Sequence, residues 1–167
     1  MSERIKQLQI NDAYLQAYAD PDGDGGADAL YFPNRHLPVR ADLFNRVAWQ
    51  LRTRSNVTVY AWMPVLAFDL EKGVWVESSR RPGEPSREGG YRRLSPFDAN
   101  TRRIIGEMYE DLAKSAHFGG LLFHDDAYLT DNEDSSAAAR EAVAKHFEHE
   151  STPQSPEALA RFKTEWL

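Results

Sequence analysis

The stretch Val57-Thr-Val-Tyr-Ala-Trp-Met-Pro-Val-Leu-Ala-Phe68 decides the fold class of this chain. It is almost continuously apolar and rich in β-branched and aromatic residues, which is typical of a β-strand buried on both faces. Apolar residues at helical spacing precede it over 41–54 and follow it over 98–116. A buried strand between two amphipathic helices predicts a parallel sheet covered by helices, which is an α/β architecture.

Shorter segments extend this alternation in both directions. Residues 12–19 and 119–124 have the composition of strands, and residues 137–150 and 156–167 have that of helices. Ser95 or Asp98 is the expected cap of the helix over 98–116. The polar, Gly- and Arg-rich segment 73–95 interrupts the pattern, and we interpret it as an inserted hairpin. The chain therefore contains about three strand–helix units with parallel strands.

Composition excludes several classes of protein. The 167 residues predict one domain and are too few for a complete eightfold βα barrel. The formal net charge of −6 argues against a nucleic-acid or anionic-membrane binder, because both need a basic face. The absence of cysteine excludes disulfides and thiol catalysis. We find no run of about 18 apolar residues, which a membrane helix requires, and no signal-peptide pattern at the start.

Functional residues of a parallel sheet gather where its strands end. After the first strand, Asp20-Pro-Asp-Gly-Asp-Gly25 matches the opening of a calcium-binding EF-hand loop, but the twelfth position is Tyr31, which cannot supply the required carboxylate. A tight turn with Asp20 lining a site is the preferred interpretation. After the second strand, Trp62 and Met63 lie beside Pro64. Trp62 is a candidate for stacking on a ligand or for core packing.

The third strand end, 123–134, concentrates acidic residues. His124, Asp125 and Asp126 follow directly, and further acids come within nine residues. Helix capping by Asp131, Asn132 or Asp134 explains some of them. Adjacent carboxylates suit glycoside hydrolysis, where one protonates the leaving oxygen and another handles water or positive charge. A divalent metal site and a structural turn remain open alternatives.

The chain resembles the C-terminal domain of bacterial poly-β-1,6-N-acetyl-D-glucosamine deacetylases of the biofilm export system. The resemblance rests on residues 19–25, 31–51, 59–66 and 123–134 and extends over the whole chain. It implies a partial (β/α) TIM-like barrel, with residues 1–167 forming part of the C-terminal glycoside-hydrolase-like domain. Compared with that family, we expect the N-terminal polysaccharide deacetylase domain to be absent and the chain to be a fragment.

The resemblance also implies functional residues. It implies that Asp125 and Asp126 are the catalytic carboxylates. The residues implied to bind substrate are Asp20, Trp62, Met63, His124, Asp131 and Glu133. No cofactor and no metal are implied. Trp49 is expected to lie in the core and Trp75 to be exposed.

The expected function is binding and cleavage of the partially deacetylated polymer. A non-catalytic polymer-binding module and a metal-dependent hydrolase using His124, Asp125 and Asp126 are the alternatives. Expected partners are the polymer, the missing deacetylase domain with the rest of the barrel, and the outer-membrane export porin. Nucleic acid is not expected as a partner. The implied location is the periplasm, associated with the outer membrane.

Overall fold

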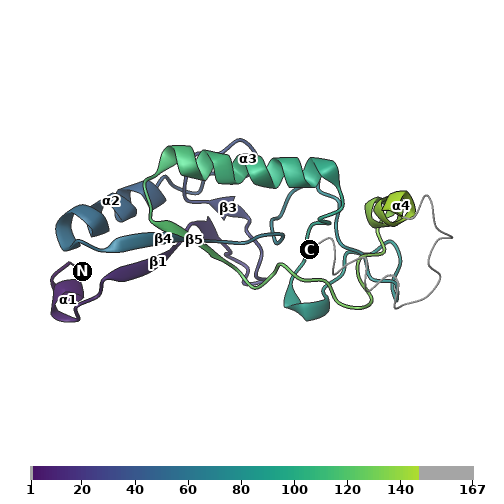
Figure 1. Ribbon diagram of the computed structural model, residues 1–167, viewed down its shortest axis with the longest axis horizontal. Coiled ribbons are helices and arrows are strands. Elements are labelled where there is room, and N and C mark those ends of the chain that lie inside the picture. The colour runs from purple at the N-terminus through teal and green to yellow at the C-terminus, as the bar shows by residue number, and fades with distance from the viewer. Residues whose placement is uncertain (1, 147–167) are drawn as a thin grey trace.

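The structure is a computed structural model that describes residues 2–146 (Figure 1). The helix predicted over 156–167 and the end of the one predicted over 137–150 lie outside the described residues. The elements, in chain order, are α1 Ser2–Gln7, β1 Asp12–Gln16, β2 Tyr18–Ala19, β3 Ala29–Leu30, α2 Phe44–Ser55, β4 Thr58–Met63, a 3₁₀ turn Glu88–Gly90, α3 Ala99–Ser115, β5 Gly120–Phe123 and α4 Ala137–His146.

The main sheet has three parallel strands in the order β1-β4-β5. The central strand β4 is the one that contains the apolar stretch, and in its register Trp62 lies opposite Gln16 on one side and Leu122 on the other. α2 connects β1 to β4, and α3 connects β4 to β5. This order confirms the predicted α/β architecture with parallel strands. β2 and β3 form a separate antiparallel pair just beyond β1.

The prediction that the central strand is buried on both faces is wrong. Val59, Ala61 and Met63 are fully buried and pack among residues of α2 and α3. Tyr60 and Trp62 alternate with them and are only half-buried, because α2 and α3 lie on the same side of the sheet (Figure 1). On the other side, Tyr60 stacks on Tyr14 with ring centroids 5.2 Å apart. The face of the sheet opposite α2 and α3 is therefore only partly covered, up to the carboxyl ends of the strands.

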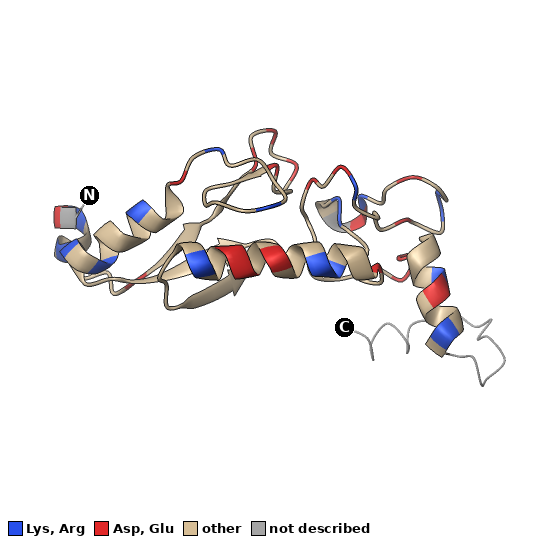
Figure 2. Cartoon of the chain, turned by 90° about the horizontal axis from the view of Figure 1, so that it is seen from above, with Lys and Arg blue, Asp and Glu red and all other residues tan. Residues whose placement is uncertain are grey.

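The long helix α3 follows the sequence prediction. Asp98 caps it, with its Oδ2 accepting a hydrogen bond from the Thr101 N–H at 2.7 Å. Its buried face repeats every four residues through Ile104, Met108 and Leu112. Its outer surface carries charges of both signs (Figure 2), including the Arg103–Glu107 and Lys114–Glu110 pairs. No helix in residues 2–146 combines the length and the apolar character that a bilayer crossing requires.

Two tryptophan predictions are corrected by the structure. Trp49 is 54% exposed, because the core face of α2 consists of Phe44, Ala48 and Leu51 and Trp49 points away from it. Trp75 is partly buried against the main core, and the Arg92 guanidinium lies 4.2 Å from its ring centroid. The expected hairpin over 73–95 is present only as isolated antiparallel bridges at 75↔94 and 77↔85.

Candidate functional site

Aromatic rings line the carboxyl ends of β4 and β5. Trp62, near the end of β4, stacks on His124, which follows β5, with centroids 5.8 Å apart and planes 14° from parallel. Tyr18 meets both rings edge-on at 6.3 and 6.4 Å, and Tyr91 meets His124 edge-on at 4.9 Å. We call these four residues the aromatic wall. The backbone holds it in place, since the His124 N–H donates to the Met63 carbonyl at 2.8 Å.

Asp125 presents its carboxylate beside this wall. Its side chain is 82% exposed and lies 3.1 Å from His124 Nδ1. The Tyr91 hydroxyl donates a hydrogen bond to Asp125 Oδ1 at 2.8 Å. That hydrogen bond is the main cause of a raised Tyr91 pKa, and burial adds to it. Tyr91 therefore remains a hydrogen-bond donor to Asp125 at neutral pH.

Asp126 has entirely different surroundings. It is fully buried, and its carboxylate accepts hydrogen bonds from the backbone N–H groups of residues 65, 66 and 67 at distances from 2.5 to 3.1 Å. Hydrogen bonds to an ionised acceptor are stronger than neutral ones. Asp126 thus connects the loop after β5 to the segment after β4. Of the two adjacent carboxylates, Asp125 is exposed and Asp126 has a structural role.

The other predicted site residues differ in their exposure to solvent. Met63 and Glu133 are fully buried, Met63 because it lies on the helix side of β4 and Glu133 because it pairs with Arg93. Of the acids in 125–134, only Asp125 and Asp131 are exposed. The predicted caps of α4 are replaced by Ser136, whose Oγ accepts a hydrogen bond from the Ala139 N–H.

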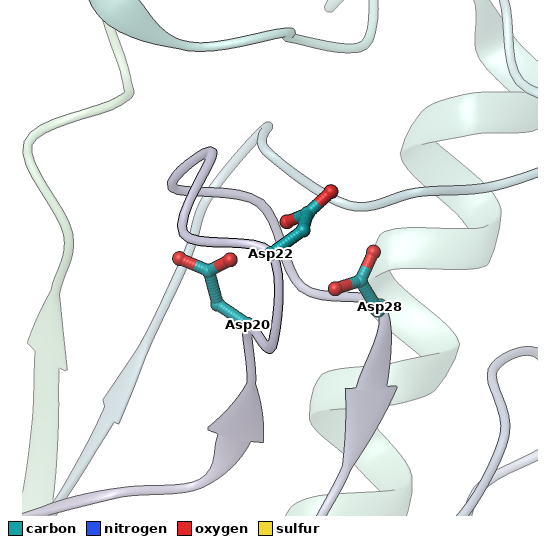
Figure 3. A group of neighbouring side chains, drawn as sticks. All are labelled: Asp20, Asp22 and Asp28. Carbon is teal, nitrogen blue, oxygen red and sulfur yellow. The ribbon is translucent and has the colours of Figure 1, made fainter.

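Asp20 organises the loop between β2 and β3. Its carboxylate accepts hydrogen bonds from the N–H groups of Gly23, Asp24 and Gly25 at 2.8–3.1 Å, as a tight turn requires. The carboxylates of residues 20, 22 and 28 have oxygens within 4.8 Å of one another (Figure 3). These residues are the ones in the described part of the chain whose spacing could hold a metal ion.

Asp28→Asn is expected to raise the free energy of unfolding near neutral pH. The pKa of Asp28 is raised by burial and then by the nearby charges of other aspartates, and its buried Oδ2 has no hydrogen-bond partner. Because the folded-state pKa lies above the ordinary value of 3.8, the charged form destabilises the fold. The advantage of the variant should shrink as the pH falls through the raised pKa.

Urea unfolding at several pH values, in buffer with a chelator, measures this effect. The chelator removes any cation that would reverse the sign by binding the three carboxylates. Asp12→Asn at the exposed start of β1 is the control. A constant difference between the Asp28→Asn variant and the wild type at every pH would contradict the prediction.

Sequence reasoning missed Tyr91, which lies in the insertion and reaches the site from 34 residues before Asp125. Its sequence signal was weak, an aromatic residue after two glycines. Gly25 makes room for it, since a Cβ at Gly25 would lie 2.4 Å from Tyr91 Cδ1. Tyr18 lies at the end of the segment 12–19 that the sequence predicts as a strand, and burial and neighbouring acids raise its pKa to about 12.

Together, the fold and site define a class of protein. Parallel strands that end in an exposed carboxylate and stacked aromatic rings are features of carbohydrate-active α/β proteins. Residues 1–166 match the family described as hypothetical glycosyl hydrolase family 13, and the chain belongs to this family.

Individual relatives agree with this family. The chain is 48% identical over 174 residues to the poly-beta-1,6-N-acetyl-D-glucosamine N-deacetylases of Escherichia coli K12 and O157:H7. The match covers 99% of this chain and 26% of each relative, so the chain spans about a quarter of their length. The predicted resemblance to this deacetylase family is thereby confirmed.

Solved structures agree as well. The PgaB (BpsB) glycoside hydrolase domain from Bordetella bronchiseptica is 50% identical, with a TM-score of 0.81 over 98% of this chain and 48% of that chain. A hypothetical protein from Ruminiclostridium thermocellum, 11% identical with a TM-score of 0.56, shares the fold alone. The fold of this chain therefore corresponds to part of a glycoside hydrolase domain.

Proposed function

We propose that this chain binds partially deacetylated poly-β-1,6-N-acetyl-D-glucosamine and takes part in cleaving it. The observation that carries the proposal is the exposed Asp125 carboxylate beside the aromatic wall. Trp62 and Tyr91, half-buried members of the wall, offer an apolar surface for a sugar ring. The carboxylate offers the charge that glycoside hydrolysis requires. The names of the relatives, a deacetylase of this polymer and a glycoside hydrolase domain, support the choice of substrate.

In this proposal, Asp125 acts in its ionised form. The Tyr91 hydroxyl donates a hydrogen bond to Asp125 Oδ1, and a carboxylate held in this way suits activation of water or stabilisation of positive charge at the anomeric carbon. Asp131 is exposed on the same loop and is the proposed partner that protonates the leaving oxygen. Asp126 contributes by holding the loop after β4 and does not meet the sugar.

Free amines on the polymer explain the proposed preference for deacetylated substrate. A glucosamine ammonium is attracted to carboxylates and to the faces of tryptophan and tyrosine rings. Asp125 supplies a carboxylate and Trp62 an aromatic face at the strand ends. Asp20 adds a further negative charge nearby, since its charge is one cause of the raised pKa of Tyr18 in the wall.

The test is cleavage of polymer samples with graded degrees of deacetylation. We expect new reducing ends from the partially deacetylated polymer and none from the fully acetylated one, with the products identified by mass spectrometry. A chelator should leave the rate unchanged. Loss of activity with the chelator would instead favour the metal-dependent alternative, which the hydrogen bonds already made by both Asp126 oxygens argue against.

A non-catalytic binding module is the second candidate. It is favoured by the burial of Asp126, because the adjacent acids then do not form an acid/base pair at the surface. Polymer binding without any new reducing ends would select it over the hydrolase.

The proposed cellular setting rests on the resemblance to the deacetylase family. We place the protein in the periplasm, associated with the outer membrane, where the export porin would receive the polymer. A deacetylase domain and the rest of the barrel are its proposed partners, since the chain covers 26% of the deacetylases and 48% of the solved hydrolase domain.

A further inference from the structure

We propose that Arg93 and Glu133, a buried ion pair outside the aromatic wall, are positioning residues that hold Tyr91 against Asp125. The inference rests on the proposed function and names two residues that act through others without touching the substrate. Arg93 comes two residues after Tyr91, and Glu133 lies in the loop that Asp125 begins. The pair thus joins the two segments whose contact is the Tyr91–Asp125 hydrogen bond.

The ion pair is fully enclosed. Both side chains are 0% exposed, and Arg93 Nη2 lies 2.7 Å from each carboxylate oxygen of Glu133. Taking two charges out of water is costly, and a buried pair often adds little net stability over apolar residues of similar size. A contribution to the placement of the site therefore explains the pair better than stability does.

Arg93 also contacts the backbone on both sides of the junction. Its Nη1 donates to the Tyr128 carbonyl and its Nη2 to the Glu88 carbonyl, each at 2.5 Å. The guanidinium lies 4.8 Å from the centroid of the Tyr128 ring. Tyr128 is three residues beyond Asp125, and Glu88 is three residues before Tyr91. One guanidinium fork therefore contacts the two segments that carry the donor and the acceptor.

Neighbouring contacts strengthen the same junction. Glu133 Oε2 accepts a hydrogen bond from the Thr130 N–H at 3.0 Å. The Glu88 carboxylate accepts one from the Thr130 hydroxyl at 2.8 Å, which joins the segments a second time. On its other side, the Tyr91 ring packs against Gly25, where φ is +85° and no Cβ occupies the space. Gly25 of the Asp20 turn therefore contacts the Tyr91 ring, while Arg93 secures the chain segment from which this ring extends.

Arg93→Lys tests the role. Lysine keeps the charge, but its ammonium lacks the planar fork that reaches several acceptors together. The first readout is the titration of the Tyr91 ring by ¹³C NMR of labelled tyrosine, with the signal assigned from Tyr91→Phe. Its pKa is raised in the wild type mainly by the Asp125 hydrogen bond, and should return toward 10.0 when that bond is lost. Arg103→Lys, on the exposed face of α3, is the matched control.

The second readout is catalysis of the proposed cleavage. A misplaced group should lower kcat by up to about 100-fold. KM should change much less, because Trp62, Tyr18 and His124 contact one another and do not depend on Arg93. If the lysine variant does not fold, the Tyr91 titration and the cleavage kinetics are measured instead on Arg93→Met/Glu133→Leu, which removes both charges together. An unchanged Tyr91 titration in a folded variant would overturn the inference. A shifted titration supports the positioning role even if the wild type cleaves nothing, which would refute only the proposed function.

Discussion

Asp125→Asn is expected to lower the rate of polymer cleavage by about 100- to 10,000-fold, the usual contribution of an acid/base group. The amide cannot carry the negative charge that activates water or stabilises the anomeric carbon. Its carbonyl oxygen can still accept the hydrogen bond from Tyr91, so the aromatic wall should stay in place. The main effect should therefore be a fall in kcat, and KM should rise only to the extent that the lost charge weakens the attraction for the polymer's amines.

The measurement is the initial rate of reducing-end formation, with the products followed by mass spectrometry. Asp12→Asn, at the opposite end of the sheet and also exposed, is the matched control and should cleave at the wild-type rate. Asp131→Asn in the same series tests the proposed proton donor. If Asp125→Asn cleaves the polymer as fast as the wild type, the assignment of Asp125 is wrong.

Arg93→Met should lower the free energy of unfolding by about 3–5 kcal/mol, the cost of breaking a buried ion pair by removing one partner. Glu133 would keep a fully buried carboxylate and lose the hydrogen bonds from both of its contacts with Arg93. The Tyr128 and Glu88 carbonyls would each lose a donor as well.

Urea unfolding followed by circular dichroism measures this loss. Arg93→Met/Glu133→Leu should recover much of it, because no uncompensated charge remains in the interior. Arg103→Met breaks an exposed pair and should cost about 1 kcal/mol or less. A loss of that small size for Arg93→Met would mean that Glu133 reaches water in solution.

Urea unfolding and the Tyr91 titration report different properties of Arg93. Loss of a buried contact explains a fall in the free energy of unfolding, whereas a changed Tyr91 titration in a folded variant reports geometry at the site. The conservative Arg93→Lys separates these effects since it retains the positive charge next to Glu133. The variants together distinguish a residue that only stabilises the fold from one that also positions Asp125.

The sequence by itself determined the main helices, the strands of the parallel sheet and the end of that sheet where the candidate site lies. Apolar spacing marked α2 and α3, the composition of 57–68 marked β4, and Asp98 was recognisable as a cap. These features are local, since a helix or strand imposes its period on residues close in sequence. Alternation of helices with strands then made the strands parallel, which placed Trp62, His124 and Asp125 at one edge.

Only the tertiary structure decided which of those residues reach solvent and which partners they meet. Asp125 and Asp126 are chemically identical neighbours, yet one is exposed and the other is enclosed by the segment after β4. Met63 is buried beside the half-exposed Trp62, because neighbouring strand residues point to opposite faces. Tyr91 bonds to Asp125, 34 residues away in the sequence, and Arg93 bonds to Glu133, 40 residues away. No local sequence pattern encodes such contacts. The physical reason is that burial and pairing depend on what covers a side chain, and that is set by the packing of distant segments.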